Sequence, residues 1–207
     1  RNEFSTMRNS VGCYIYSLGE KLGGHIGILS FSRLEWVIVQ YACYGYGFIP
    51  VPIYDTFSWE NINYIIKHAE LHIAFVISTK VNKLLEKIDS NSPLTHIIVI
   101  DVEDSPYDFS TAPKTKINLH KFVDSLNSNQ NFPQSPPQPS TPAFIMYTSG
   151  TTGNPKGCVI THANFISTAA SIYIYAYPFS RDDRMLSYLP LAHVYESVQH
   201  VVALKVC

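Results

Sequence analysis

The chain has 207 residues, 46% of them apolar, and a formal net charge of −1, so it is long enough to bury a sizeable core. Charged residues make up 15%, against about 25% in an average soluble domain, which excludes a charge-rich disordered chain. A near-neutral chain also lacks the basic surface that a nucleic-acid partner requires.

The chain start and the cysteines bear on the compartment. Residues 1–10 are polar and do not form a signal peptide. The cysteines lie far apart and form no CxxC pair, which favours a reducing compartment over a disulfide framework. These cysteines are Cys13, Cys43, Cys158 and Cys207.

The first hundred residues alternate between apolar runs and amphipathic segments. Strands are expected at His25–Leu29, Phe48–Ile53, His72–Ile77 and Ile97–Ile100. Helices are expected after three residues that can cap a helix N-terminus, Ser32, Ser58 and Thr79. Two helices carry apolar stripes, formed by Ile62, Ile65, Ile66 and Ala69 and by Val81, Leu84, Leu85 and Ile88. This alternation predicts a largely parallel sheet covered by helices on both faces.

One uncharged segment, from Trp36 to Tyr54, approaches the length of a membrane-spanning helix. Glycines and prolines crowd its second half: Gly45, Gly47, Pro50 and Pro52. Because these residues end helices, we expect a helix followed by a strand rather than a membrane span.

The composition changes in the middle of the chain. The stretch from Ser125 to Pro155 has no charged residue, and Pro133 to Pro142 is proline-rich, which is typical of an extended, semi-rigid connector. We therefore predict an N-terminal α/β subdomain at 1–124, a connector at 125–142 and the start of a second α/β subdomain at 143–207.

The second part is expected to contain strands at Ala143–Tyr147, Cys158–Thr161 and Arg184–Leu189. Thr161 can cap a helix whose apolar side carries Phe165, Ala169, Ile172 and Ala176. A last helix is expected from near Tyr195, with Val198, Val201, Val202 and Val206 on its apolar side.

The segment Tyr147-Thr-Ser-Gly-Thr-Thr-Gly-Asn-Pro-Lys-Gly157 carries the clearest chemical signal. Its hydroxyl side chains can donate to phosphate oxygens: Thr148, Ser149, Thr151 and Thr152. Its glycines let backbone N–H groups approach an anion: Gly150, Gly153 and Gly157. Lys156 adds a point charge suited to a polyphosphate. The composition suits a triphosphate; a solvated surface turn is the alternative interpretation.

The loop differs from two common nucleotide-binding loops. A Walker A loop needs Gly directly before Lys and Ser or Thr directly after it, whereas here Pro155 precedes Lys156 and Gly157 follows. The loop also lacks GxGxxG spacing. Because an apolar run follows it, we expect it to join two strands.

The segment matches every fixed position of T-S-G-T-T-G-x-P-K-G, the phosphate-binding loop of the adenylate-forming enzymes. Leu189-Pro-Leu-Ala-His-Val-Tyr-Glu196 resembles the L-P-L-A-H-x-x-E segment of long-chain fatty acyl-CoA synthetases. Arg33-Leu-Glu-Trp36, Val51-Pro-Ile-Tyr-Asp-Thr56 and Thr161-His-Ala-Asn164 also resemble segments of these enzymes. The resemblance runs from about Gly27 to Val206.

The resemblance implies an α/β fold with largely parallel sheets flanked by helices, as the incomplete N-terminal domain of an adenylate-forming enzyme. It implies a reaction in which a long-chain fatty acid and ATP give an acyl-adenylate and pyrophosphate, and coenzyme A then displaces AMP. ATP, Mg²⁺ and coenzyme A are the implied cofactors and co-substrates. The implied ATP-binding residues are Thr148, Ser149, Gly150, Thr151, Thr152, Gly153, Lys156 and Gly157. Lys156 would act catalytically on the leaving pyrophosphate, and His193 would border the acyl-adenylate.

Several side chains allow more than one interpretation. His193 is alternatively a histidine held in a packed turn, and Glu196 either orients neighbours or favours the helix N-terminus through its dipole. His68 and His72 are four residues apart, but no HExxH pattern is present, so no metal site is predicted.

The resembling enzymes are much longer and use downstream segments that this sequence lacks. We therefore expect the chain to need the C-terminal part of the same protein for activity, and to expose an apolar patch. The expected location is the cytoplasm or the cytoplasmic face of an intracellular membrane such as the endoplasmic reticulum, with peripheral membrane association. Another adenylate-forming ligase, of aryl-CoA or peptide-synthetase type, and a non-catalytic nucleotide-binding module are the alternatives.

Overall fold

The computed structural model describes residues 2–101, 107–113, 115–128, 130–148, 153–175, 180 and 182–206. Its elements follow in the order α1 (Asn2–Ser17), β1 (His25–Leu29), α2 (Leu34–Tyr46), β2 (Ile49–Ile53), α3 (Trp59–His68), β3 (Ile73–Val76), α4 (Ser78–Lys87), β4 (His96–Val99), the 3₁₀ helix η1 (Phe109–Thr111), β5 (Asn118–Lys121), α5 (Phe122–Leu126), β6 (Pro142–Thr148), β7 (Lys156–Thr161), α6 (His162–Tyr175) and α7 (Val194–Val206).

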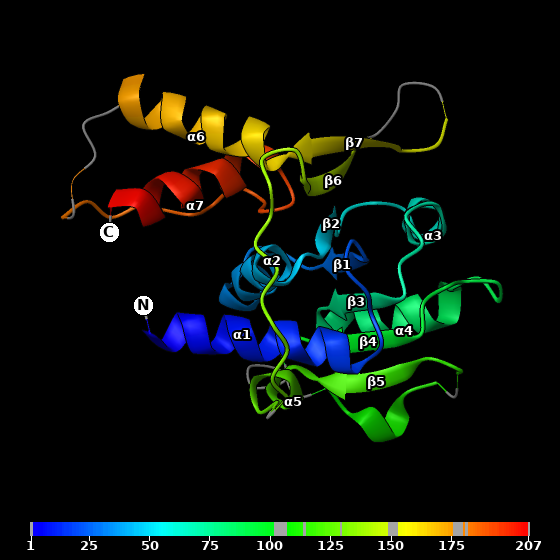
Figure 1. Ribbon diagram of the computed structural model, residues 1–207. Coiled ribbons are helices and arrows are strands. Elements are labelled where there is room, and N and C mark those ends of the chain that lie inside the picture. Colours follow the sequence, from blue (N-terminus) through cyan, green and yellow to red (C-terminus); the bar gives the residue numbers. More distant parts are fainter. Residues whose placement is uncertain are drawn as a thin grey trace.

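The first part of the chain forms a parallel sheet in the order β2-β1-β3-β4-β5 (Figure 1). Its strands pair in continuous register, with His25 opposite Ile49 and Ile26 opposite Ile73. The prediction of a largely parallel sheet is therefore confirmed. The first four predicted strands correspond to β1, β2, β3 and β4.

Helices cover both faces of this sheet and divide the core into two clusters. One cluster joins α1 and α2 to side chains such as Ile26 and Phe75 of the sheet. The other joins α3 and α4 to the opposite face, where Val76 and Ile97 lie. The two predicted helical stripes are buried here, except that Ile88 is only partly buried.

Of the three helix caps predicted in the first part of the chain, the structure confirms one and corrects two. Ser58 Oγ accepts a hydrogen bond from the N–H of Asn61 at 3.3 Å, as expected for the cap of α3. Thr79 does not cap α4, which begins one residue earlier, at Ser78. There the buried Asp101 carboxylate accepts from Ser78 N at 2.6 Å and from Ser78 Oγ at 2.7 Å. A carboxylate from a neighbouring strand end thus replaces the predicted local cap.

The cap predicted at Ser32 is also wrong. Helix α2 begins at Leu34, and its N-cap Arg33 makes no side-chain capping bond. The Arg33 guanidinium instead donates to both carboxylate oxygens of Glu35 at 2.7 Å. The Ser32 hydroxyl bonds a distant segment, because the chain is folded back against it at this point.

Four elements were not predicted from sequence: α1, η1, β5 and α5. Helix α1 has a largely polar surface, and its buried residues include Val11, Cys13 and Ile15. Strand β5, Asn-Leu-His-Lys, lacks an apolar run and lies at the edge of the sheet, where its side chains are half-buried or exposed. Edge position thus permits a strand without the apolar pattern of a buried one.

The segment after α5 runs in extended form along α1 and α2 (Figure 1). Hydrogen bonds hold it against these helices: Phe132 N donates to Cys13 Sγ at 3.4 Å, the Gln134 amide to Asn9 Oδ1 at 3.0 Å, and Ser135 N to the Gly45 carbonyl at 2.9 Å. The predicted division into 1–124, 125–142 and 143–207 stays a prediction.

Strands β6 and β7 form an antiparallel hairpin that contacts β2 (Figure 1). Strand β6 contributes to both core clusters, because alternate side chains point to opposite faces: Phe144 and Met146 to one, Ile145 and Tyr147 to the other. Thr161 caps α6 as predicted, since its Oγ1 accepts from the N–H of Asn164 at 3.2 Å. The predicted position of Ala176 in α6 lies outside the described residues.

The segment 184–189, predicted as a strand, belongs to neither sheet of the described chain. Its side chains are exposed except that of Leu189, which is half-buried; Leu186 is 79% and Tyr188 75% accessible. The apolar pattern that indicated a strand thus has no partner strand here to complete a ladder.

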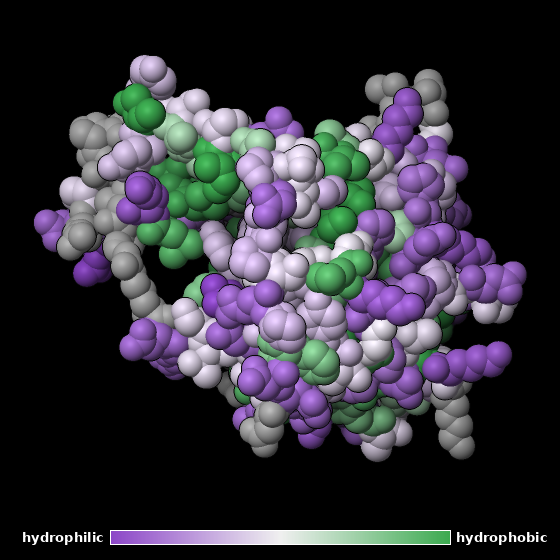
Figure 2. Space-filling model, in the orientation of Figure 1, coloured by the Kyte–Doolittle hydropathy of each residue, from purple (hydrophilic) through white to green (hydrophobic). Residues whose placement is uncertain are grey.

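Large apolar side chains are exposed elsewhere too, as was expected. Ile166 and Ile174 of α6 and Leu204 of α7 are each at least half accessible, and Figure 2 shows hydrophobic surface gathered over these helices. In the described part of the chain, no helix is both long and apolar enough to cross a bilayer. The uncharged run from Trp36 to Tyr54 is divided between α2 and β2, with Gly47 ending α2 at a φ of 74°.

Candidate functional site

The predicted phosphate loop joins the two strands of the β6–β7 hairpin, as expected. Thr148 ends β6, Lys156 begins β7, and the two residues are directly opposite each other. Opposite residues of an antiparallel pair project to the same face, so the Thr148 hydroxyl and the Lys156 ammonium share one side of the loop base. Both side chains are exposed. The other predicted hydroxyls and one glycine lie outside the described residues: Ser149, Gly150, Thr151 and Thr152.

The two described glycines of the loop serve different purposes. Gly153 has a φ of 114°, a conformation that glycine adopts readily and other residues rarely do. Gly157 leaves room for a neighbour, because a Cβ there would lie 3.1 Å from Ile145 Cγ2 and 3.2 Å from Tyr147 Cζ. At Gly157 the missing side chain thus admits the ring of Tyr147, whereas the sequence suggested room for a ligand.

His193 lies at the start of α7 with an exposed side chain. Its Nδ1 accepts a hydrogen bond from the N–H of Tyr195 at 3.2 Å, so one ring nitrogen caps the helix. The predicted contact with an acyl-adenylate stays a prediction. It would have to use the remaining nitrogen or the face of the ring.

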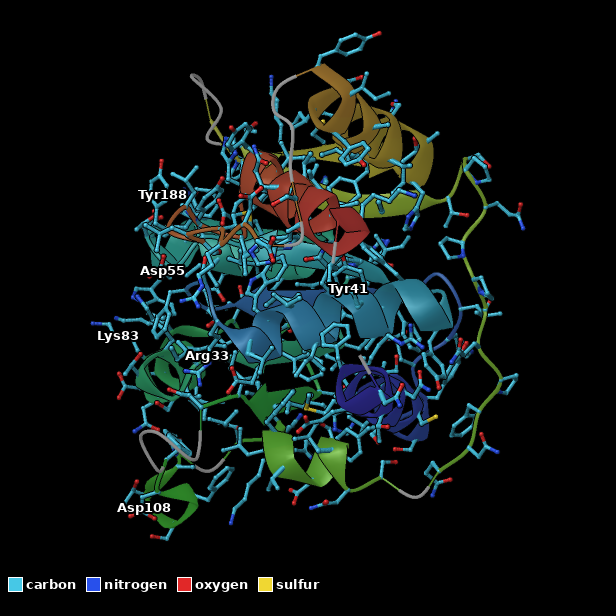
Figure 3. All side chains as sticks on the ribbon, turned by 90° about the vertical axis from the view of Figure 1, so that its left-hand side faces the viewer. Arg33, Tyr41, Asp55, Lys83, Asp108 and Tyr188 are labelled. Carbon is cyan, nitrogen blue, oxygen red and sulfur yellow. The ribbon has the colours of Figure 1, made fainter. Side chains whose placement is uncertain are left out.

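The segment before His193 covers the carboxyl ends of β1 and β2, where open α/β sheets bind ligands. A pocket of about 300 Å³ lies between them. Its lining residues are Ser30, Phe31, Ser32, Tyr54, Asp55, Ser187, Tyr188, Pro190 and Ala192. Figure 3 shows Asp55 and Tyr188 together at this edge of the molecule.

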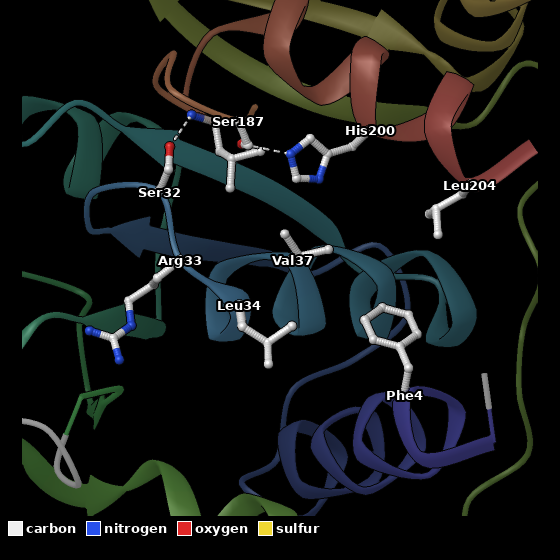
Figure 4. A pocket seen from close by; sticks show the side chains of 9 residues that line it. Phe4, Ser32, Arg33, Leu34, Val37, Ser187, His200 and Leu204 are labelled. Atoms are coloured by element: carbon white, nitrogen blue, oxygen red, sulfur yellow. Dashed lines mark hydrogen bonds between the residues drawn. The ribbon is translucent and has the colours of Figure 1, made fainter. Parts of the chain in front are cut away.

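Two serines clamp this segment through its backbone. Ser32 Oγ donates to the Leu189 carbonyl at 2.9 Å and accepts from Leu191 N at 2.9 Å (Figure 4). Ser197 Oγ donates to the Leu191 carbonyl at 3.0 Å. Leu191, two residues before His193, is therefore held on both sides. This role of Ser32 had no signal in the sequence, because the bonded residues are far away along the chain.

A second pocket, of about 440 Å³, lies beside the clamp, between α1, α2 and α7 (Figure 4). At one side Ser187 Oγ lies 2.9 Å from His200 Nε2, and Glu196 Oε1 lies 3.6 Å from the same nitrogen. Burial lowers the pKa of His200, and the nearby Glu196 carboxylate partly opposes this shift. Because both contacts use Nε2, these residues do not have the geometry of a catalytic triad, in which the acid contacts Nδ1.

The positions of Glu196 and of the His68–His72 pair are also settled by the fold. Glu196 lies in the first turn of α7, where the helix dipole favours a carboxylate. His68 ends α3 and bonds Tyr147, whereas His72 lies before β3 with its Nδ1 3.6 Å from Glu20. The two histidines thus have separate partners.

A parallel α/β sheet joined to a hairpin with a Gly/Thr-rich, lysine-containing loop is the architecture of the AMP-binding enzymes. The chain matches this family over residues 2–206 and belongs to it. The resemblance drawn from the sequence motifs is confirmed.

The relatives of the chain include long-chain acyl-CoA synthetases. It is 34% identical over 204 residues to "Long chain acyl-CoA synthetase 6, peroxisomal" of Arabidopsis thaliana, covering 97% of this chain and 28% of that protein. It is 36% identical over 188 residues to "Long-chain-fatty-acid--CoA ligase 1" of Homo sapiens, covering 86% of this chain and 27% of that protein. The chain thus spans less than a third of the length of either relative.

A solved structure has the same fold. The anthranilate CoA ligase AuaEII in complex with anthranoyl-AMP matches with a TM-score of 0.70 and 25% identity, covering 83% of this chain and 31% of that chain. A mostly parallel sheet flanked by helices is therefore the fold that this chain shares with adenylate-forming enzymes.

Proposed function

We propose that the protein containing this chain is an ATP-dependent long-chain fatty acid–CoA ligase. In the first step a fatty acid carboxylate attacks the α-phosphate of ATP, giving an acyl-adenylate and pyrophosphate. In the second step the coenzyme A thiol attacks the acyl carbonyl and AMP leaves. The main support is the complete phosphate-loop motif on a hairpin that sets Thr148 opposite Lys156, in a chain related to long-chain acyl-CoA synthetases.

The proposed role of Lys156 follows from the charges that the first step brings together. A carboxylate and a triphosphate repel each other, and negative charge accumulates on the departing pyrophosphate. The ammonium of Lys156, at the base of the loop, offsets that charge. Thr148 donates its hydroxyl to a phosphate oxygen from the opposite strand.

Mg²⁺ enters this proposal as a partner of ATP. In the described part of the chain no group of three His, Cys, Asp or Glu side chains is placed to hold a metal by itself. A Mg²⁺ ion bound mainly through phosphate oxygens and water needs no such group, and the Thr148 hydroxyl is a suitable further oxygen. The metal would neutralise phosphate charge.

Because a long-chain acid partitions into bilayers, we also propose contact with the cytoplasmic face of a membrane.

Two other functions remain as alternatives. The solved relative acts on an aromatic acid, so an aryl-CoA ligase is one of them, and a peptide-synthetase adenylation domain would use the same loop. A protein that binds nucleotide without catalysis is the other. The segments around Tyr54–Thr56 and Leu191–His193 resemble long-chain enzymes and favour the fatty acid.

Acid-dependent exchange of pyrophosphate into ATP by the complete protein tests the proposal. Long-chain fatty acids should support exchange, whereas anthranilate, benzoate and amino acids should not. Lys156→Ala should lower the exchange rate by about a hundredfold, the scale of losing one group that stabilises transition-state charge.

Lys83→Ala is the matched control, because Lys83 is an exposed lysine on α4 (Figure 3), and its exchange rate should equal that of the unaltered protein. If an aromatic acid supported exchange and fatty acids did not, the protein would be an aryl-CoA ligase rather than a fatty acid–CoA ligase. Unchanged exchange in Lys156→Ala would refute the phosphate-loop assignment.

A further inference from the structure

One hydrogen bond connects the predicted phosphate loop to a helix from the first part of the chain. His68 Nδ1, at the end of α3, lies 2.6 Å from the hydroxyl oxygen of Tyr147. Tyr147 is the residue directly before Thr148, at the end of β6. The two rings meet edge to face with centroids 5.8 Å apart.

Tyr147 lies next to both ends of the loop. It is 2% exposed, and its ring lies against Gly157, its partner across the hairpin. Thr148 follows it on one strand, and Lys156 precedes Gly157 on the other. A shift of the Tyr147 ring would therefore displace the backbone on both sides of the loop.

His68 is itself held in place. Its ring stacks on Tyr64, one helical turn earlier, with centroids 5.2 Å apart and planes 21° from parallel. Burial, and the nearby Tyr64, raise the pKa of Tyr147 to about 12, so its phenol keeps the proton that it can donate to His68. Helix α3 is anchored in the core by Ile62, Ile65 and Ile66, which gives the contact a fixed base.

We propose that His68 is a positioning residue for ATP: through Tyr147 it fixes the two ends of the phosphate loop so that Thr148 and Lys156 meet the triphosphate together. This inference rests on the proposed use of ATP. It assigns His68 a role in ATP affinity although the side chain is on a different element from the loop.

The test compares His68→Leu, His68→Asn and Tyr147→Phe in the complete protein. His68→Leu and Tyr147→Phe should each raise the KM for ATP between about two- and tenfold, the range that one neutral hydrogen bond accounts for. The KM for the fatty acid should stay within twofold. His68→Asn, which places an amide near the position of Nδ1, should restore most of the ATP affinity.

The double variant His68→Leu/Tyr147→Phe separates a shared contact from two independent effects. If both residues act through one hydrogen bond, its KM for ATP should equal that of the worse single variant. His72→Leu is the matched control, a histidine four residues away on the chain, and should leave the KM for ATP unchanged. Multiplied single effects, or equal increases in both KM values, would overturn the inference.

Hydrogen exchange keeps this inference separate from the proposed function. In His68→Leu the backbone amides of Lys156–Thr161 should exchange faster than in the unaltered protein, whereas those of β3 should not change. If the unaltered protein showed no pyrophosphate exchange with any acid, the proposed function would fail, and this measurement would still decide whether His68 holds the loop. If the β7 amides of His68→Leu exchanged at the same rate as in the unaltered protein, the positioning role of His68 would be refuted.

Discussion

Ser32 joins two parts of the chain that are more than 150 positions apart in sequence. Its hydroxyl donates to the Leu189 carbonyl and accepts from the Leu191 N–H, which are 157 and 159 residues further along the chain. Ser32→Ala removes both bonds and leaves two partly buried backbone groups without that partner. We expect the free energy of unfolding to fall by about 1–2 kcal/mol.

Urea denaturation measures this effect, with Ser171→Ala as control. The Ser171 hydroxyl is exposed and donates to the Ser167 carbonyl one turn back, so its removal should change stability by less than about 0.5 kcal/mol. If the two substitutions changed the free energy of unfolding equally, the hydrogen bonds of Ser32 would make no special contribution to stability.

Local patterns predicted a residue's role when its partners are near in sequence. Ser58 and Thr161 cap the helices that follow them, because the bonded amides lie three residues ahead. Ser32 and Thr79 have the same residue types in similar positions. The caps predicted at these two residues were wrong because distant groups form the local hydrogen bonds. Leu189–Leu191 bond Ser32, and Asp101 bonds Ser78 at the start of α4.

The same limit applies at the site. Thr148 and Lys156 were predicted from a motif, and the hairpin register sets them opposite each other. The role of His68 as a partner of Tyr147 had no signal in the sequence, because the two residues are 79 positions apart.

Whole elements were predictable where their apolar residues form a strong local pattern. Helix α3 and strand β3 carry such patterns and were predicted. Helix α1 buries Val11, Cys13 and Ile15 among polar residues, and the edge strand β5 is half-buried or exposed, so both lack a strong pattern and were missed. The segment 184–189 has a strand pattern without a partner strand in the described chain. Pattern therefore indicates what an element can bury, and the neighbours decide whether it does.

Helices α1 and α2 pack closely because Gly12 faces Tyr46. A Cβ at Gly12 would overlap the Tyr46 ring, and the Tyr46 hydroxyl accepts a hydrogen bond from Cys13 Sγ at 3.4 Å. Gly12→Ala should therefore force the helices apart and lower the free energy of unfolding by about 1–3 kcal/mol, although alanine is the better helix former.

Gly45→Ala, in α2, is the matched control for this substitution. A Cβ there would meet only the Arg8 side chain, at 3.8 Å, so the gain in helix propensity should leave stability equal or raise it by up to about 1 kcal/mol. Thermal unfolding of both variants checks the prediction. A Gly12→Ala protein as stable as Gly45→Ala would show that α1 is free to move away from α2.

At the scale of the whole molecule, histidines couple stability to pH. Burial lowers the pKa of His96, His120, His162 and His200 in the folded chain, and the neighbouring His96 charge adds to the shift at His120. The unfolded chain therefore binds protons at a higher pH than the folded chain does. The part of the stability that depends on these histidines is fully present above about pH 6.5, the ordinary histidine pKa. It is lost as the pH falls from there through the folded pKa values.

His96 and His120 form the part of this set that links separate elements. His96 Nδ1 lies 2.9 Å from His120 Nε2, and His120 Nδ1 lies 2.9 Å from the hydroxyl oxygen of Tyr14, which joins β4, β5 and α1. The nearby Asp124 carboxylate opposes the lowering of the His120 pKa. Protonating both rings would break the bond between them, because neither facing nitrogen could then accept.

Urea denaturation between pH 7.5 and 5 should therefore give a free energy of unfolding that falls with pH below about 6.5. The double variant His96→Gln/His120→Gln should reduce that slope, because two of the contributing groups no longer titrate. Tyr14→Phe should lower stability at every pH and keep the slope, since it removes a hydrogen bond and leaves both histidines. The lowered pKa of Asp89 and Asp108 acts near pH 4 and below, outside this range. An unchanged slope in the double variant would assign the pH dependence to the other histidines.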